Sequence, residues 1–133
     1  MPLKERDRLP SGIFITFSGN CKEALDFYRE CFGGIVHLET FDEALYRNTK
    51  RPVIIGSLIS DRLIIHGSDL VHDSGRKIGN HLSIFLPCKD EEDRQYLVHK
   101  LESTDRKQLH PAVQEQKLIE VTDRFAVSWV LSI

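Results

Sequence analysis

Apolar residues in the first half of the chain are spaced in a pattern that predicts one strand, one helix and three further strands. The run Ile13 to Phe17 is β-branched and aromatic, and Gly12 and Gly19 border it, as is typical of a buried strand. The later strands are expected over residues 35–41, 53–59 and 62–67. Ser60 and Asp61 separate the last two strands, which predicts a tight hairpin turn.

Between the first two strands, a helix is predicted to begin near Cys21 and to end at Gly33. Asn20 and Glu23 have the spacing of a capping box. Apolar residues then recur at helical spacing and charged residues occupy the other positions, which predicts one buried and one solvated face. Gly33 can adopt the left-handed conformation that ends many helices.

The same order of elements begins again at His81. Residues 81–86 form an apolar run typical of a strand, and Asp90 with Asp93 can cap a second helix. The apolar stripe of that helix is predicted to contain Tyr96, Leu97 and Leu101. Strand-like runs follow at 117–121 and 125–133 around a turn at 122–124, and residues 108–114 predict a short irregular strand broken by Pro111.

This repetition predicts a single α+β domain over residues 1–133, made of two consecutive βαβββ modules. The polar, glycine-containing stretch between the two halves predicts a linker or loop. The expected boundaries are about 11–67 for module one, about 68–80 for the linker and about 81–133 for module two.

Composition and charge exclude several classes of protein. The chain has 133 residues and a formal net charge of −2, which argues against a protein that tracks nucleic-acid phosphates. Its three cysteines lack CxxC spacing, so neither a disulfide framework nor a thiolate zinc site is expected. The N-terminal stretch MPLKERDRLP has no apolar targeting region, and no run is long enough to span a bilayer. We therefore expect a cytoplasmic protein that contacts neither membrane nor nucleic acid.

Three stretches of the chain resemble a known family. They are TFSGNCKEALDFYRECFGG, GNHLSIFLPCKDEEDRQYLVHKLE and TDRFAVSWVL, and they are similar to the signature stretches of the PhnB-like branch of the vicinal-oxygen-chelate superfamily, which includes glyoxalase I and bleomycin-resistance proteins. The resemblance spans nearly the whole chain. It implies that the two modules curl mixed sheets around a cleft, that the protein is a homodimer, and that Ala126 stands where relatives usually carry glycine.

Enzymes of this superfamily hold a divalent metal with side chains from four strands, so the resemblance also implies four ligand positions. In this chain they fall at Ile13 or Phe14, at Ile55, at His81 and at Val130. Only His81 offers a donor atom, whereas a catalytic metal usually has three protein ligands. We therefore expect no chelated metal and no cofactor.

Six residues are candidates for lining the cleft. They are His81, Ser83, Ile55, Ser57, Ser128 and Val130. For His81 two interpretations stand side by side: an acid, base or ligand-orienting donor, or a half-buried strand histidine bonded to a neighbouring backbone group. No catalytic residue is assigned.

Two other groups of residues offer weaker candidates. His66, Asp69, His72 and Asp73 match neither a helical zinc pair nor a calcium loop, so an exposed, solvated loop is expected, in which the resemblance gives the Ser-Asp pair a structural role. Cys21 stands at a predicted helix N-terminus, where the dipole can lower the pKa of a thiol. No second thiol or histidine is adjacent in sequence, which favours a core cysteine.

The expected function is the binding of a small molecule in a metal-free cleft, with any enzymatic activity unassigned. PhnB-like relatives are often labelled demethylubiquinone methyltransferase-like, but the chain has no glycine loop for S-adenosylmethionine or a dinucleotide, so this reaction is not adopted. Three alternatives remain: sequestration of a hydrophobic or cationic compound, as by bleomycin-resistance proteins; a metal-dependent isomerase or dioxygenase; and a vestigial or regulatory dimer without a ligand.

Overall fold

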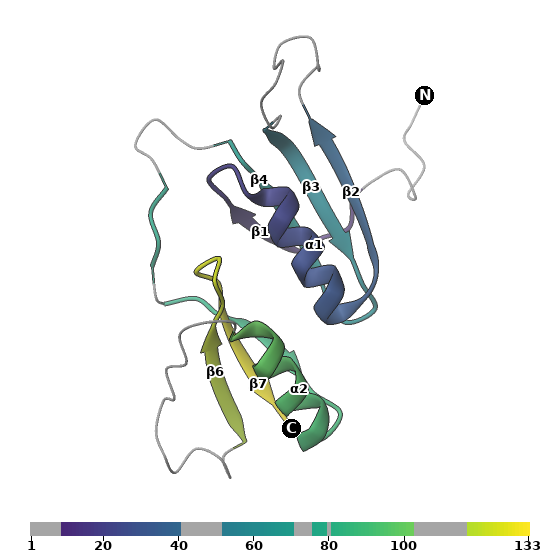
Figure 1. The fold of residues 1–133 in the computed structure, drawn as a ribbon, viewed down its shortest axis with the longest axis vertical. Helices are drawn as coiled ribbons and strands as arrows, with labels where there is room; N and C mark the ends of the chain where they lie inside the picture. Colours follow the sequence, from purple (N-terminus) through teal and green to yellow (C-terminus); the bar gives the residue numbers. More distant parts are fainter. Residues whose placement is uncertain (1–8, 41–51, 71–75, 80, 103–116) are drawn as a thin grey trace. The chain divides into compact units, whose positions relative to one another are not determined.

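The first half of the chain folds as a four-stranded mixed sheet with one helix on it. In a computed structural model, residues 9–40, 52–70, 76–79, 81–102 and 117–133 are described, and the chain divides into two units, Met1–Arg76 and Lys77–Ile133. The elements of the first unit are β1 (Ile13–Thr16), α1 (Cys21–Phe32), β2 (Ile35–Thr40), β3 (Val53–Ile59) and β4 (Ile64–Ser68). The strand order is β1-β4-β3-β2, with β1 parallel to β4 and the other neighbours antiparallel (Figure 1). The predicted order of elements is confirmed.

Helix α1 packs on one face of this sheet (Figure 1). Its buried side includes Leu25 and Tyr28, both fully excluded from solvent, as expected from the helical spacing of its apolar residues. The sheet has glycine where the packing is closest. A Cβ at Gly56 would lie 2.6 Å from Leu25 Cδ1, and one at Gly67 would lie 2.7 Å from the Phe17 ring. Both glycine positions therefore face α1.

The N-terminus of α1 is capped by a residue that lies far away in the sequence. The helix begins at Cys21 as predicted, but the Asn20 side chain makes no capping hydrogen bond, so the predicted capping box is wrong. Instead, Asp69 Oδ1 accepts hydrogen bonds from the backbone N–H groups of Gly19 and Cys21, each at 2.9 Å. Asp69 Oδ2 accepts a third from Val53 N at 2.9 Å. The carboxylate thus joins the start of α1 to β3.

The predicted hairpin between β3 and β4 is present, but its turn lies one residue further along. Ser60 N donates to Leu63 O at 3.1 Å, so Asp61 and Arg62 occupy the tip in place of Ser60 and Asp61. The Ser60 hydroxyl donates to Phe32 O and accepts from Arg62 N. These bonds hold Ser60 at the base of the turn.

The second unit has a smaller mixed sheet and one helix. Its elements are β5 (Ile84–Pro87), α2 (Glu91–Leu101), β6 (Leu118–Thr122) and β7 (Ser128–Ser132). The strand order is β5-β7-β6, with β5 parallel to β7 and β6 antiparallel to it. This is the arrangement of β1, β4 and β3 in the first unit. The predicted irregular strand at 108–114 lies outside the described residues.

The strand that opens the second unit is shorter than predicted. The prediction placed residues 81–86 in a strand, but β5 begins at Ile84. The ladder between β5 and β7 starts at the pair Ile84 and Trp129, so the residues before Ile84 have no partner in this ladder. His81 and Ser83 therefore precede the strand, and both are exposed.

Helix α2 is capped as predicted, whereas its buried stripe differs from the prediction. Asp90 Oδ1 accepts from Asp93 N at 2.8 Å, which is the expected N-cap bond. Leu97 and Leu101 are fully buried, but Tyr96 is 52% exposed, so its predicted place in the stripe is wrong. The buried positions Arg94, Leu97, Val98 and Leu101 follow the helical repeat, and residue 96 falls beside them.

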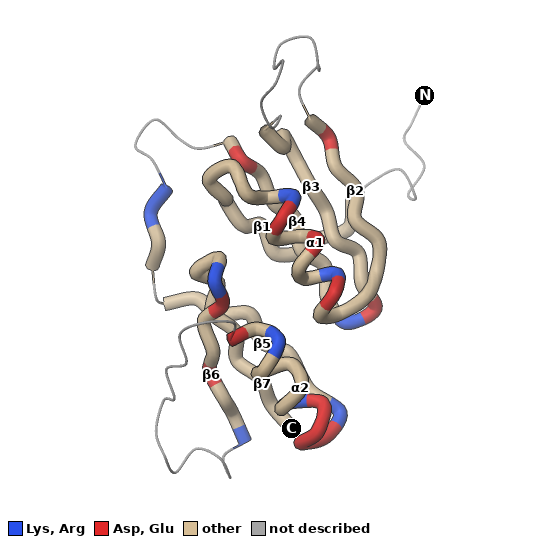
Figure 2. The backbone as a smooth tube through the Cα atoms, viewed as in Figure 1, with Lys and Arg blue, Asp and Glu red and all other residues tan. Residues whose placement is uncertain are grey.

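Charged residues of both signs lie on the two helices (Figure 2). In α2 the acidic side chains gather in the first turn and the basic ones in the last, which suits the helix dipole. Neither described helix has the length and apolar composition needed to cross a bilayer.

The turn between β6 and β7 is organised by a buried carboxylate. Asp123 Oδ1 accepts from Phe125 N at 2.8 Å and from Val127 N at 3.1 Å. Asp123 Oδ2 accepts from Trp129 Nε1 at 2.9 Å, and the Trp129 side chain is fully buried. Within this turn Ala126 has φ of 66°, a left-handed conformation that favours glycine.

Candidate functional site

One face of the first sheet is not covered by α1, and we call it the helix-free face. Side chains alternate between the two faces of a strand, and Gly56 and Gly67 face the helix. Their neighbours Ser57 and His66 therefore point to the opposite side. In the register of the sheet, Phe14 pairs with His66, His66 with Ser57, and Ser57 with His37. These four residues form a row across all four strands, which we call the cross-sheet row.

The centre of the cross-sheet row is a hydrogen-bonded chain. Ser57 Oγ lies 2.7 Å from His66 Nδ1, and His66 Nε2 lies 2.7 Å from Pro10 O. A carbonyl oxygen can only accept, so His66 Nε2 carries a proton and donates it. In the neutral imidazole Nδ1 is then the acceptor, and the Ser57 hydroxyl donates to it. The Pro10 carbonyl therefore fixes the tautomer of His66, and the Ser57 hydroxyl, which can donate or accept, adapts to it.

The row is buried at its centre and open at its ends. Ser57 is 2% exposed and His66 is 8% exposed, whereas Phe14 is 58% exposed and His37 is also exposed. The segment that leads into β1 carries Pro10, and its carbonyl meets His66 on the helix-free face. This contact covers the imidazole.

Apolar side chains flank the cross-sheet row. Ile55 and Ile59 lie two residues to either side of Ser57 on β3, so they share its face, and both are half-buried. Their partners on β2 are Glu39 and Ile35, which are exposed. The predicted cleft residues Ile55 and Ser57 therefore lie together on the helix-free face, the first partly accessible and the second buried.

The second sheet also has a face opposite its buried side. Trp129 and Leu131 are fully buried, so Ser128 and Val130 point the other way. Val130 pairs with Phe85, which is 60% exposed, and with Glu120. The predicted residues Ser128 and Val130 thus lie on one face of this unit. His81 and Ser83 precede the strand and belong to no ladder among the described residues.

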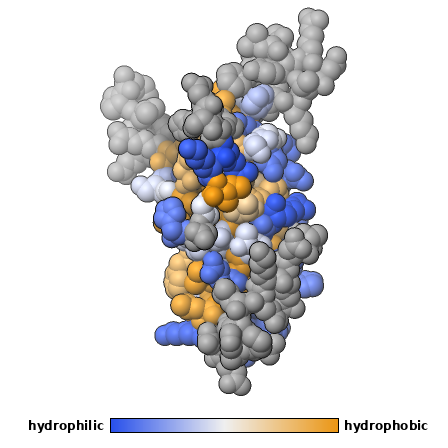
Figure 3. Space-filling model, turned by 90° about the vertical axis from the view of Figure 1, so that its left-hand side faces the viewer, coloured by the Kyte–Doolittle hydropathy of each residue, from blue (hydrophilic) through white to orange (hydrophobic). Residues whose placement is uncertain are grey.

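The two units place comparable residues at equivalent positions of their sheets. Phe14 of β1 pairs in parallel with His66 of β4, and Phe85 of β5 pairs in parallel with Val130 of β7. The two phenylalanines have nearly equal exposure, 58% and 60%. Large apolar side chains are exposed in both units, and orange apolar patches lie beside hydrophilic surface (Figure 3). The imidazole and hydroxyl pair is a feature of the first unit.

The residues at the four ligand positions that the resemblance implies do not fit a chelated metal. Phe14, Ile55 and Val130 have no donor atom, and His81 stands outside the sheet. His66, a donor at a neighbouring position, has both ring nitrogens within hydrogen-bond distance of protein oxygens. Within the described ranges, no group of three or more His, Cys, Asp or Glu side chains is arranged to hold a metal ion.

The expectation of a solvated loop at residues 66–73 is wrong for its first part. His66 is buried in β4, and Asp69 caps α1 as a structural residue, which agrees with the role implied by the resemblance. His72 and Asp73 lie outside the described residues. The apolar alternation that predicted the strand over 62–67 was the signal that could have assigned His66 to the sheet. His37 was also missed, because an exposed strand histidine has no local signature.

Cys21 has none of the properties of a reactive thiol. Burial, and to a smaller extent the nearby negative charge of Asp69, raises its pKa from 9.0 to about 12. The helix dipole does not lower this pKa, because the Asp69 carboxylate occupies the helix N-terminus. Cys21 is fully buried against the sheet, as the core interpretation predicted.

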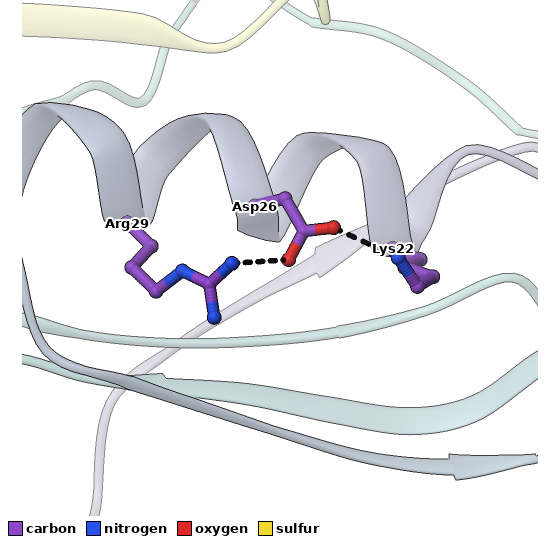
Figure 4. Close-up of polar contacts among 3 residues, drawn as sticks. All are labelled: Lys22, Asp26 and Arg29. Atoms are coloured by element: carbon purple, nitrogen blue, oxygen red, sulfur yellow. Dashed lines mark hydrogen bonds and ion pairs between the residues drawn. The ribbon is translucent and has the colours of Figure 1, made fainter.

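A shallow groove of about 690 Å³ lies beside the first turns of α1, but its charged groups have partners. It is lined by Asn20, Lys22, Asp26, Leu38, Thr40 and Asp69, among others. Asp26 binds Lys22 at 2.9 Å and Arg29 at 3.3 Å along the helix surface (Figure 4). Asp69 is occupied by three backbone N–H groups. The helix-free face is therefore the stronger candidate for a functional site.

Comparison with known proteins identifies the fold. No model of a known protein family and no curated protein matches the chain. Among solved structures, a protein from Pseudomonas aeruginosa is 22% identical with a TM-score of 0.70, covering 94% of this chain and 97% of that one. A PhnB protein from Bacillus cereus, named as a 3-demethylubiquinone-9 3-methyltransferase, is 24% identical with a TM-score of 0.71, covering 93% and 98%.

A third structure carries the name of the superfamily. It is a member of the glyoxalase/bleomycin resistance protein/dioxygenase superfamily from Sphaerobacter thermophilus, 21% identical with a TM-score of 0.51, covering 93% of this chain and 97% of that one. At these identities the likeness establishes the fold. The α+β chain with its two small mixed sheets therefore has the glyoxalase/bleomycin-resistance fold, and the resemblance to PhnB-like proteins is confirmed at that level.

Proposed function

We propose that the chain is a PhnB-like member of the vicinal-oxygen-chelate superfamily that binds a small organic molecule on the helix-free face of its first sheet, without a chelated metal. The observation that carries this proposal is the cross-sheet row. It combines an exposed aromatic ring, a buried imidazole of fixed tautomer, a buried hydroxyl and an exposed imidazole. Small-molecule sites have this composition, a mainly apolar surface with a few oriented polar groups.

The apolar part of the face supports a ligand with an aromatic or aliphatic group. Phe14 is 58% exposed and Ile35 is 62% exposed, and Ile55 is half-buried on the same face. An aromatic contact with Phe14 contributes about 0.5–1.5 kcal/mol beyond the area that it buries. Glu39 lies on the same face and disfavours an anionic ligand.

The side chains at the implied ligand positions support the part of the proposal that concerns binding without a metal. A Lewis-acid mechanism needs a metal held by several protein ligands with open coordination positions, and among the residues at the implied positions only His81 has a donor atom. Elemental analysis of the untagged protein tests this part of the proposal. About one transition metal per chain, lost in His81→Ala, would contradict it and favour a metal-dependent enzyme.

A thermal-shift screen with a metabolite library tests the binding. A compound at 100 times its dissociation constant stabilises the folded state by about 2.7 kcal/mol, which is easily measured as a rise in melting temperature. We expect the shift to be lost in Phe14→Ala. The matched control is Phe85→Ala, which removes an equally exposed ring at the equivalent position of the second unit and should keep the shift.

The outcome of the screen also separates the alternatives. If no compound raises the melting temperature, the proposal is wrong and a dimer without a ligand is favoured. If a ligand is recovered unchanged after incubation, the protein sequesters it, and a chemical change would identify an enzyme.

We further propose that the protein is a homodimer. Its support is the exposure of large apolar side chains, such as Leu82 at 76% and Ile78 at 62%, because such residues in contiguous patches mark interaction surfaces. Light scattering should give twice the chain mass of 15.3 kDa at micromolar concentration. A mass near that of one chain would refute the dimer.

A further inference from the structure

The segment Leu9–Gly12 contacts the helix-free face, on which we propose that a small molecule binds. Pro10 O accepts from His66 Nε2 at 2.7 Å, so the segment reaches the centre of the cross-sheet row. All four residues of the segment are exposed. It is therefore a surface strap whose one backbone oxygen satisfies a buried side chain.

A close contact fixes the base of this strap. A Cβ at Gly12 would lie 2.7 Å from both Cγ2 and the carbonyl oxygen of Ile64. The carbonyl oxygen of Ile64 belongs to the backbone and cannot rotate away as a side chain could. Glycine is therefore required where the strap leaves the sheet. Any side chain at this position would push the strap away from β4.

The His66 N–H cannot be left without an acceptor at low cost. Its ring is 8% exposed, and a buried donor that loses its partner costs about 1–3 kcal/mol. A molecule that displaced the strap would therefore have to offer an oxygen at the place where Pro10 O now lies. The carbonyl oxygen of Pro10 thus lies where an oxygen atom of such a molecule would have to bind.

We infer that the strap is an internal competitor, and that the ligand is a neutral molecule with a carbonyl oxygen that binds His66 Nε2 and an apolar or aromatic group that packs against Phe14. This inference rests on the proposed function. A molecule whose polar end is an ammonium group would place donors against the donating N–H and is excluded from this position. A carboxylate is disfavoured by Glu39 on the same face.

The test uses two probes of the same skeleton and two variants of the strap. Acetophenone carries a carbonyl, and 1-phenylethylamine carries an ammonium group at the same atom. Gly12→Ala should displace the strap, and Ser11→Ala is the matched control on the same segment. Dissociation constants are measured by NMR titration of the full chain, with far-UV circular dichroism to verify the fold.

We expect acetophenone to bind Gly12→Ala about fivefold more tightly than the natural chain, the factor that corresponds to one net hydrogen bond. The Ser11→Ala variant should match the natural chain, and the amine should gain nothing. Equal gains for both probes would mean that the strap only covers the surface, which would overturn the inference about the carbonyl.

A second measurement uses the natural chain, so it tests the competition between ligand and strap even if Gly12→Ala does not fold. Saturating acetophenone should remove the nuclear Overhauser contact between Pro10 and the His66 ring in the natural chain, because the ligand releases the strap from His66 Nε2. A retained contact with bound acetophenone would refute competition, while binding at the face would still stand. If neither probe nor any library compound binds, the proposed function fails together with this inference.

Discussion

Replacing Asp69 by alanine removes the acceptor of three backbone N–H groups at once. Gly19 N and Cys21 N lose their partner at the start of α1, and Val53 N loses its partner on β3. The Gly19 bond is exposed, so water can replace it there. The Cys21 and Val53 bonds are partly buried, and those two donors remain without an acceptor.

The expected loss of stability follows from these two donors. A hydrogen bond to a charged group contributes about 1.5–3 kcal/mol, so two of them predict a loss of about 4 kcal/mol for Asp69→Ala. In Asp69→Asn one oxygen is retained for the helix N-terminus, and only the bond to Val53 is replaced by a contact between two donors. The expected loss is then about 2 kcal/mol.

Urea denaturation followed by circular dichroism measures both values. Because small domains are stable by only about 5–15 kcal/mol, the alanine variant approaches the limit of folding, and the asparagine variant keeps the comparison measurable. The reasoning would be refuted if both variants lost less than about 1 kcal/mol, or if asparagine were as damaging as alanine.

Four further predictions concern three side chains. Ala126→Gly should raise stability by about 1 kcal/mol and the melting temperature by a few degrees in calorimetry, because glycine accepts φ of 66° without strain; a decrease would contradict this. Asp123→Asn should destabilise by about 2 kcal/mol, since an amide N–H would face Trp129 Nε1, and urea denaturation should show a smaller loss when the same change is made in a Trp129→Phe background. Cys21 should resist iodoacetamide at pH 9 while the half-buried Cys88 reacts, as read by peptide mass spectrometry. Because the folded-state pKa of Cys21 is raised to about 12 from 9.0, its contribution to stability is present below pH 9 and is lost toward pH 12, a slope that Cys21→Ala should lack.

The elements of the fold were predictable where the signal is local. Apolar runs and helical spacing predicted the strands and helices, and Asp90 with Asp93 predicted a cap that lies within four residues. The cap of α1 could not be predicted in this way, because Asp69 is brought to Cys21 by the pairing of β1 with β4. A sequence pattern contains no record of such a contact.

In the candidate site too, features with a local signal in the sequence were predictable, and features that depend on distant contacts were not. Ile55 and Ser57 were named as cleft candidates, and they share one face of β3 because side chains alternate along a strand, while the register of the neighbouring strands decides what lies beside them. His66 was assigned to a polar cluster because its neighbours Gly67 and Asp69 are typical of loops. Its burial depends on Pro10, more than fifty residues earlier in the chain.

The long-range cap of α1 has a consequence for the order of events during synthesis. Cys21 leaves the ribosome 48 residues before Asp69, and α1 is only 12 residues long. An isolated helix of this length is marginal in water, and closing a loop of this size carries an entropic cost that must be met before the contact stabilises anything. We therefore expect the nascent helix to fluctuate until β4 has emerged, so that α1, β3 and β4 become ordered in one step, and stalled chains that end before residue 69 should remain sensitive to protease throughout the first unit.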